Sequence, residues 1–247
     1  MLVRLPGTYP AQGDTRLLTD TLVSRGLAVG RRVLDICTGG GALALAAGRA
    51  GASAVTAVDL SRRSVITARI NSRLHRTPVT VHQGDLFAPV HGERFDLVLS
   101  NPPYVPAAGE VLPRHRSARS WDAGRDGRAI LDRICAGVPD VLSEQGVLLL
   151  THSVLSDEEA TLERLQRAGL VAEVVARADE PFGPVMRRRA ALLRSRGLLA
   201  PGQQSEGLVV IEARVRKPAA REESDLRTVS LTAPPRSSTG ESGQDVA

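Results

Sequence analysis

Short apolar segments alternate with helical patterns along most of the chain, and this alternation limits the possible folds more than any other feature. Each apolar segment is bounded by turn-forming residues, as buried strands are. Strands that alternate with helices form a mostly parallel sheet with helices on both faces. We therefore predict an α/β fold with seven strands, the last inserted antiparallel beside its predecessor. The predicted strands are residues 31–37, 54–59, 79–82, 95–99, 146–151, 170–176 and 208–215, and the predicted helices lie within residues 9–25, 42–50, 61–74, 128–142, 157–168 and 185–199.

We expect Asp14 to cap the first helix, which has an apolar stripe of Leu17, Leu18 and Leu22. We expect Ser61 to cap the third helix, whose predicted apolar face consists of Val65, Ile66, Ile70 and Leu74.

A glycine-rich turn follows the first predicted strand. Thr38-Gly39-Gly40-Gly41 joins this strand to an alanine- and leucine-rich helix. Glycines let the backbone approach a ligand closely, and the start of the helix offers unpaired N–H groups. The next strand ends at Asp59, at a distance that suits a carboxylate accepting ribose hydroxyls. The same pattern also matches a dinucleotide site, so NAD is an alternative ligand at this point.

Three acids stand at the ends of successive strands: Asp35, Asp59 and Asp85. Each alone is most simply a turn former or helix cap. Together they are more informative, because ligands of open α/β sheets bind at the carboxyl ends of the strands. We expect three acids, with no arginine near the glycine turn, to bind an adenosine that carries a sulfonium and an ammonium. These groups describe S-adenosylmethionine.

The fourth predicted strand runs directly into Ser100-Asn101-Pro102-Pro103-Tyr104. Two prolines remove two backbone donors and fix φ, so the strand ends in a rigid corner. At this corner Asn101 Oδ1 and a proline carbonyl can accept the two N–H bonds of an amide or amine, while Tyr104 covers its face. The alternative is an ordinary proline loop with a surface tyrosine.

Composition restricts the location and the partners. The net charge is +5 with a pI near 10.1, which is compatible with nucleic acid. Aromatic residues are only 2% and do not interleave with the basic runs, so a bias toward arginine is the favoured interpretation. Cys37 and Cys135 lack the neighbours of a zinc or redox motif, and neither a signal peptide nor an apolar membrane span is present. We expect a cytoplasmic protein without a resident metal.

The chain divides into an expected catalytic domain and a tail. We assign residues 1–216 to the domain, with residues 1–30 as an N-terminal cap segment. Residues 217–247 are rich in Pro, Ser, Thr, Glu and Gly, and we expect them to be disordered. Residues 105–119 form a long polar loop, which suggests function or mobility.

These motifs resemble those of a known family. Asp35-Ile36-Cys37-Thr38-Gly39-Gly40-Gly41, Asp59, Gly84-Asp85 and Asn101-Pro102-Pro103-Tyr104 look like the successive motifs of class I S-adenosylmethionine methyltransferases, which have a Rossmann-like fold. Within them the chain is similar to the HemK family, the release-factor glutamine N5-methyltransferases. The resemblance runs from about Tyr9 to Val215 and includes the glycine-rich Trp121–Gly127 segment.

The resemblance implies a role for each matching position. It places the methionine end of the cofactor among Thr15, Asp35, Cys37, Gly39 and Gly41, the ribose at Asp59 and Leu60, and the adenine at Asp85 and Leu86. It makes Asn101, Pro102 and Tyr104 catalytic, with Asn101 also near the cofactor and with Pro103 and Val105 completing the acceptor site.

The resemblance further implies direct methyl transfer to the side-chain nitrogen of the Gly-Gly-Gln glutamine in a peptide chain release factor. Few residues precede the first strand, so the chain looks like the short branch that acts with a small zinc-binding partner. Three alternatives remain: a methyltransferase acting on exocyclic amines of RNA or DNA, a non-catalytic cofactor-binding assembly protein, and an NAD-dependent enzyme. We interpret His152 as a hydrogen-bonded polar residue rather than a general base.

Overall fold

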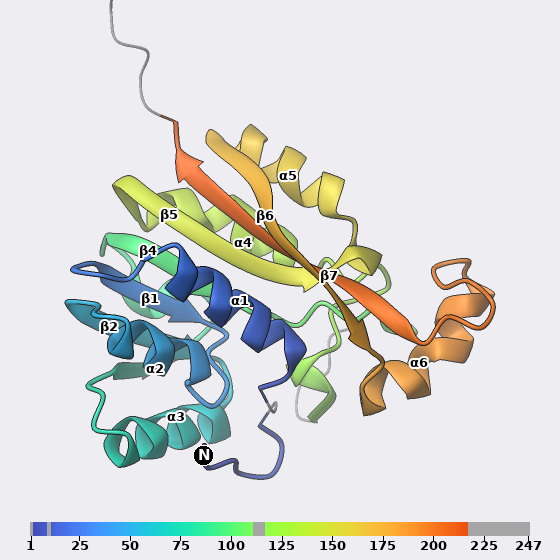
Figure 1. Ribbon diagram of the computed structural model, residues 1–247, viewed down its shortest axis with the longest axis horizontal. Coiled ribbons are helices and arrows are strands. Elements are labelled where there is room, and N and C mark those ends of the chain that lie inside the picture. Colours follow the sequence, from blue (N-terminus) through green and yellow to red (C-terminus); the bar gives the residue numbers. More distant parts are fainter. Residues whose placement is uncertain (1, 9–10, 111–116, 217–247) are drawn as a thin grey trace, which may run out of the picture. The chain divides into compact units, whose positions relative to one another are not determined.

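One seven-stranded sheet forms the centre of the fold. The computed structural model describes residues 2–8, 11–110 and 117–216 (Figure 1). The strand order is β3-β2-β1-β4-β5-β7-β6; the first five strands pair in parallel, and β7 is antiparallel to both β5 and β6. The predicted fold class and the inserted last strand are thus confirmed. The strands are β1 Arg32–Ile36, β2 Ala54–Asp59, β3 Thr80–Gln83, β4 Phe95–Ser100, β5 Leu142–Ser153, β6 Leu170–Pro181 and β7 Ser205–Val215.

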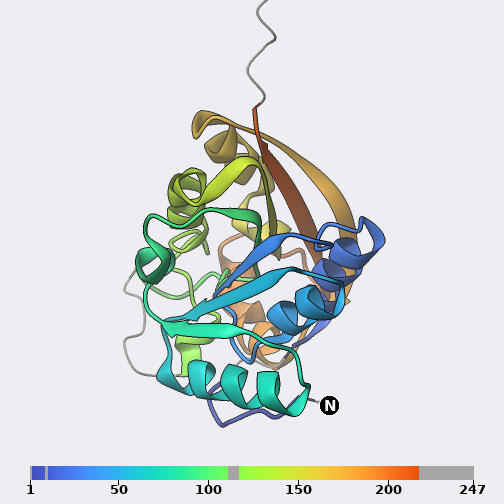
Figure 2. The ribbon, with the colours of Figure 1, turned by 90° about the vertical axis from the view of Figure 1, so that its left-hand side faces the viewer.

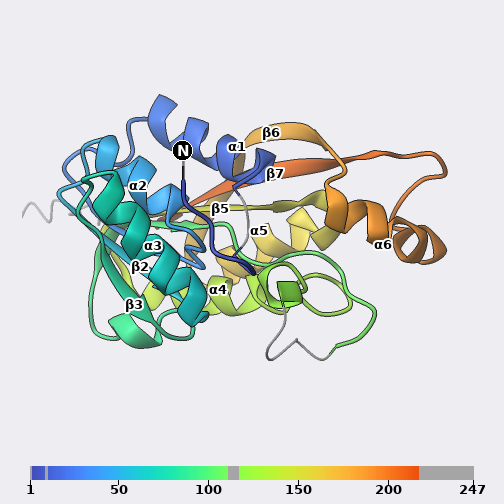
Figure 3. The ribbon, with the colours of Figure 1, turned by 90° about the horizontal axis from the view of Figure 1, so that it is seen from below.

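Helices cover both faces of the sheet. α1 (Gly13–Ser24), α2 (Ala42–Arg49) and α3 (Arg62–Leu74) lie on one face, and α4 (Leu131–Gly137) and α5 (Glu158–Arg167) lie on the other (Figure 3). Figure 2 shows the blue helices and the yellow-green helices on opposite sides of the strands. α6 (Pro184–Ser195) lies in the connection between β6 and β7. Alternate residues of the strands enter two apolar clusters, one for each face.

The start of α1 differs from the sequence prediction. Asp14 was expected to cap this helix, but Gln12 is the residue that precedes it. Asp14 lies in the first turn instead, with 2% of its surface exposed. The apolar stripe is confirmed, since Leu18 and Leu22 are fully buried. Tyr9, where the resemblance begins, lies outside the described residues.

The buried face of α3 was predicted correctly only in part. Ser61 does cap the helix, because its side chain accepts a hydrogen bond from the Ser64 amide. However, Ile66 and Leu74 are exposed by 39% and 62%. The face that packs on the sheet consists of small or polar residues together with one valine: Ser64, Val65, Thr67, Ala68 and Asn71. Apolar spacing was therefore right for Val65 and wrong for Ile66 and Leu74.

Element boundaries in the second half of the chain also differ from the prediction, as at the end of β6, Pro181, and the start of β7, Ser205. α4 is shorter than expected, because the chain turns into a 3-10 helix at Val138–Asp140, which contains Pro139. β5 is longer at both ends, so His152 lies within the strand and is fully buried. The predicted disordered tail, residues 217–247, and part of the predicted loop, residues 111–116, lie outside the described residues. No helix in the described ranges is long and apolar enough to cross a membrane.

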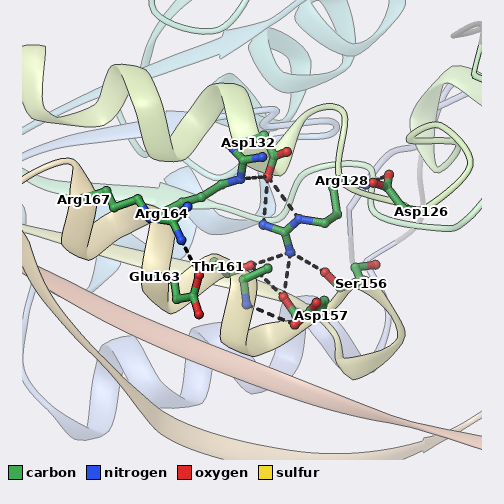
Figure 4. Close-up of polar contacts among 10 residues, drawn as sticks. Asp126, Arg128, Asp132, Ser156, Asp157, Thr161, Glu163, Arg164 and Arg167 are labelled. Carbon is green, nitrogen blue, oxygen red and sulfur yellow. Dashed lines mark hydrogen bonds and ion pairs between the residues drawn. The ribbon is translucent and has the colours of Figure 1, made fainter.

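A buried arginine joins the segment before α4 to the start of α5. Arg128 is 7% exposed, and its guanidinium donates to the carbonyls of Ser156 and Asp157 and to the Thr161 hydroxyl (Figure 4). The same group forms an ion pair with Asp132 at 2.8 Å between Nη2 and Oδ1. The acceptors lie in α4, in the segment before α5 and in α5, so the Arg128 side chain connects these three parts of the chain.

We predict that Arg128→Met lowers the free energy of unfolding by about 1–3 kcal/mol, because it removes the side-chain donor of the buried Ser156 carbonyl and one of the two arginines that pair with Asp132. Arg167→Met is the matched control: its ion pair with Glu163 is 72% and 61% exposed, so removing it should cost about 0.5 kcal/mol or less. Urea unfolding followed by Trp121 fluorescence measures both. Equal losses in the two variants would contradict the assignment.

Candidate functional site

A cavity of about 1320 Å³ opens at the carboxyl ends of β1, β2 and β4. Its lining comes from the loops that follow these strands and β3, from the N-terminal segment and the start of α1, from the segment around Trp121 and from Arg133 of α4. Cavities for one small ligand commonly measure about 300–1,000 Å³. This cavity is therefore large enough for a nucleoside-sized ligand together with part of a second substrate.

The glycine turn forms one wall of the cavity. Gly39 and Gly41 have φ values of 55° and 85°, in the left-handed region that glycine adopts most readily. A Cβ on Gly41 would also lie 3.2 Å from Ala68 Cβ, so glycine allows α3 to approach the turn. Gly39 lines the cavity, whereas Gly41 lies behind it, against α3.

Asp35 supports the turn from inside the protein. It is fully buried, and its Oδ2 accepts hydrogen bonds from Thr38 Oγ1 at 2.5 Å and from the Ala44 amide at 2.9 Å. Its Oδ1 has no hydrogen-bond partner among the described residues. Burial raises the pKa of Asp35 to about 7, although the two hydrogen bonds act in the opposite direction. Asp35 does not line the cavity, so the structure places it as a support for the turn.

Asp59 and Asp85 do line the cavity. Asp59 accepts hydrogen bonds from the amides of Gly39 and Ser61, both at 2.8 Å, and so links the glycine turn to the start of α3. Asp85 is half exposed and forms an ion pair with Arg133 of α4, 2.7 Å from Nη2 to Oδ2. Arg133 also lines the cavity, so an arginine stands beside Asp85 although the sequence has none near the glycine turn.

The Asn101–Tyr104 corner is held by two hydrogen bonds from α1. Asn101 Nδ2 donates to Thr15 Oγ1, and the Tyr104 hydroxyl donates to Asp14 Oδ2, each at 3.1 Å. Tyr104 is 7% exposed. Because Asn101 Nδ2 is used by Thr15, the amide presents Oδ1 as its acceptor.

The chain after the corner is fixed by backbone pairing. The Val105 amide donates to the Trp121 carbonyl, and the Ala123 amide donates to the Val105 carbonyl. Ser156 Oγ donates to the Tyr104 carbonyl at 2.7 Å. Gly127 packs so closely here that a Cβ would lie 2.3 Å from the Tyr104 carbonyl oxygen. The residues at 121–127 therefore form a second wall beside the corner, of which Trp121 and Asp122 line the cavity. We call it the acceptor wall, after the acceptor site that the resemblance implies at this corner.

Most of the site residues predicted from the sequence meet at this cavity. The exceptions are Asp35 and Gly41. The predicted residues that line it are Thr15, Cys37, Gly39, Asp59, Leu60, Asp85, Leu86, Asn101, Pro102, Pro103, Tyr104 and Val105.

Sequence reasoning missed several lining residues, above all Asp14, Asp122 and Arg133. Asp14 carried a signal, since it stands beside Thr15 at the start of a predicted helix. Asp122 lies in the glycine-rich Trp121–Gly127 segment that the resemblance singled out. Arg133 carried none, because its partner Asp85 is distant in the sequence.

A buried acid lies behind the corner. Glu206 of β7 is 7% exposed and lines a small cavity of about 40 Å³ together with Asp14, Tyr104 and Glu180. Burial raises the pKa of Glu206 to about 7, with Asp14 and Glu180 adding to the rise and a hydrogen bond to Ser153 opposing it. The folded protein therefore holds a proton on Glu206 more readily than the unfolded chain does.

A carboxyl with a raised pKa in the folded state reduces stability as pH rises between its unfolded and folded values, here 4.5 and about 7. We predict that Glu206→Gln makes the protein more stable at pH 8 by on the order of 2–3 kcal/mol, with no gain at pH 4. Glu173→Gln, at an exposed position of β6, is the control. Urea unfolding at both pH values measures the difference, and a gain that is the same at pH 4 and pH 8 would contradict it.

Comparison with known proteins shows the family. Residues 5–112 match the family described as methyltransferase small domain. A Methanocaldococcus jannaschii protein, assigned as a protein N5-glutamine methyltransferase, is 33% identical over 181 residues, which cover 73% of this chain and 90% of that protein.

Two longer relatives match over a shorter region. The ribosomal protein uL3 glutamine methyltransferase of Bradyrhizobium diazoefficiens is 42% identical over 125 residues, 48% of this chain and 39% of that protein. The release factor glutamine methyltransferase of Shewanella oneidensis is 36% identical over 145 residues, 56% of this chain and 51% of that protein. The matched region is thus about half or less of these two proteins.

Solved structures agree in fold. The E. cuniculi Mtq2-Trm112 complex, responsible for methylation of the eRF1 translation termination factor, matches with a TM-score of 0.59 and 21% identity, covering 85% of this chain and 99% of that chain. The T. thermophilus 16S rRNA methyltransferase RsmC, bound to AdoMet and guanosine, matches with a TM-score of 0.57 and 21% identity, covering 86% of this chain and 46% of that chain. At these identities the likeness concerns the fold alone. The match over nine-tenths of the M. jannaschii protein decides the family, and the chain belongs to the HemK family of class I S-adenosylmethionine-dependent methyltransferases.

Proposed function

We propose that this protein methylates the side-chain amide nitrogen of a glutamine in a protein of the translation machinery, with a peptide chain release factor as the favoured acceptor. The observation that carries the proposal is the corner, where Asn101 and Tyr104 each donate a hydrogen bond to a side chain of α1, beside a cavity of cofactor size. Relatives that act on release factors and on ribosomal protein uL3 support glutamine as the acceptor and leave uL3 as the second candidate.

The cofactor side has the right chemistry for S-adenosylmethionine. Asp59 would accept the ribose hydroxyls, Asp85 and Leu86 would border the adenine, and Thr15, Cys37 and Gly39 would lie near the methionine end. When bound, S-adenosylmethionine supplies a methyl group on a positively charged sulfur. We assign Asp35 and Gly41 an indirect role, since they shape the turn from behind.

The acceptor side explains how an amide can react. An amide nitrogen is a poor nucleophile because its lone pair is delocalised. Asn101 Oδ1 and the Pro102 carbonyl would accept hydrogen bonds from its two N–H groups. These bonds would raise the electron density on the nitrogen and orient it. Tyr104 and Pro103 would enclose the amide group, with Val105 beside them. His152 is not a candidate base, because burial lowers its pKa to about 4 and it does not line the cavity.

Other functions receive less support. The positive charge keeps an exocyclic amine of RNA or DNA as an alternative acceptor. A non-catalytic assembly role would not need the fixed Asn101–Tyr104 corner. Because the Mtq2 structure contains Trm112, we include a small zinc-binding activator as a possible requirement. We place the reaction in the cytoplasm, where both cysteines would stay reduced.

We predict that purified release factor, incubated with this protein and S-adenosylmethionine, gains one methyl group on the glutamine of its Gly-Gly-Gln tripeptide. Mass spectrometry of the tryptic peptide measures it, and uL3 is tested in parallel. Methylation of uL3 alone would move the proposal to the second acceptor. If neither protein is modified, with or without a zinc-binding activator, while RNA is methylated, the proposal is wrong.

Two variants separate the halves of the site. Asn101→Ala should leave cofactor affinity unchanged but slow methyl transfer by about 100-fold or more, because the amide loses an acceptor in the transition state. Asp59→Ala should weaken cofactor binding by about 10- to 100-fold, because a charged hydrogen-bond acceptor is lost. Isothermal titration with S-adenosylhomocysteine and single-turnover transfer measure these effects, and the exposed Asp20→Ala is the control. Full activity of Asn101→Ala would refute the acceptor assignment.

A further inference from the structure

α6 lies against the outside of the acceptor wall. Its buried residues, Met186, Ala190 and Leu193, pack into the core, and its arginines are placed around them. The small cavity that contains Glu206 is bordered by the start of α6 on one side and by Tyr104 and Trp121 on the other. The helix is therefore close to the corner although it contributes no residue to the lining of the large cavity.

One arginine of α6 reaches the wall directly. Arg189 Nη2 donates to both carboxylate oxygens of Asp122, at 2.7 Å and 2.9 Å. The side chains are 23% and 8% exposed, so this ion pair is shielded from water. Burial raises the pKa of Asp122, and Arg189 opposes that rise.

Asp122 connects this ion pair to the acceptor. It lines the large cavity, and its backbone pairs with Val105, the residue that follows Tyr104. Its neighbour Trp121 lines the same cavity, and the Trp121 carbonyl accepts a hydrogen bond from the Val105 amide. A displacement of Asp122 would therefore move both Trp121 and the chain that leaves the corner.

A second arginine strengthens the same attachment. Arg196, just after α6, donates to the carbonyls of Ala107, Ala108 and Arg125 at 2.8, 3.0 and 3.1 Å. These carbonyls belong to the two segments that pair beside the corner, since the Ala107 amide donates to Gly124. Both segments are thus attached to one helix by side chains.

We infer that α6 determines how well the methyl acceptor binds, and that Arg189 is a positioning residue that acts on the acceptor through Asp122 and Trp121. This inference rests on the proposed function for the identity of the acceptor. It assigns no role to Arg189 in cofactor binding, because the wall lies on the corner side of the cavity and the acids of the cofactor side have other partners.

The geometry of the ion pair gives a specific signature. A single nitrogen of Arg189 makes both contacts with Asp122, so the ammonium of a lysine can replace it. Methionine has a similar apolar stem without the charge. A residue that acted only by filling space would tolerate methionine as well as lysine.

The experiment compares Arg189→Lys, Arg189→Met and Arg187→Met. Arg187 is an exposed arginine on the same helix and serves as the matched control. Methyl transfer to purified release factor gives kcat and KM, and titration with S-adenosylhomocysteine gives cofactor affinity. The fluorescence of Trp121, the only tryptophan, reports the acceptor wall without any acceptor.

For Arg189→Met we expect KM for the release factor to rise about tenfold or more, because a charge-assisted contact is lost. Cofactor affinity should be unchanged, and Trp121 emission should shift to the red with greater acrylamide quenching. Arg189→Lys should have a KM and a Trp121 emission close to those of the unmodified protein. Arg187→Met should have the same KM and emission as the unmodified protein.

Three results would overturn the inference: unchanged Trp121 emission in Arg189→Met, equal defects in the lysine and methionine variants, or a loss of cofactor affinity. If the unmodified protein methylates neither the release factor nor uL3, with or without a zinc-binding activator, the proposed function fails. The Trp121 emission of the three variants still decides whether Arg189 positions the wall.

Discussion

The hydrogen bonds between α1 and the Asn101–Tyr104 corner are the interaction on which the site depends. Two consecutive prolines deprive the corner of backbone donors, so β4 cannot hold it by sheet pairing. Asp14 and Thr15 provide that support through side chains, with the Tyr104 hydroxyl and the Asn101 amide as their partners. The result is an amide whose Oδ1 has a fixed direction. α1 therefore supports the corner as well as the core.

Two of the acids at the strand ends, Asp35 and Asp59, accept hydrogen bonds from backbone amides, and these contacts form without a ligand. Asp35 holds the start of α2, and Asp59 joins the glycine turn to the start of α3. Parallel pairing brings these strand ends to one edge of the sheet, where β1 lies between β2 and β4. The shape of the glycine turn and of the neighbouring strand ends is therefore present without a ligand. This lowers the entropic cost of ordering the site when a ligand binds.

Patterns of neighbouring residues in the sequence predicted the strands and one helix cap correctly, because these features depend on short stretches of the chain. Apolar runs gave all seven strands, and Ser61 gave the cap of α3. The resemblance, not the spacing, supplied most of the cofactor-side roles. Side chains that pair across long sequence distances were not predictable: Asp14 meets Tyr104 rather than capping its own helix, and Arg133 meets Asp85. α3 packs through small and polar residues, so its apolar periodicity was misleading.

In the proposed function, the corner binds a glutamine side chain through Asn101 Oδ1 and the Pro102 carbonyl. A crystal structure of the protein with S-adenosylhomocysteine and a peptide containing Gly-Gly-Gln tests it most directly. We predict that the glutamine amide nitrogen lies within hydrogen-bonding distance of both oxygens and points toward the cofactor sulfur. A glutamine bound elsewhere, with Asn101 turned away from it, would contradict the claim.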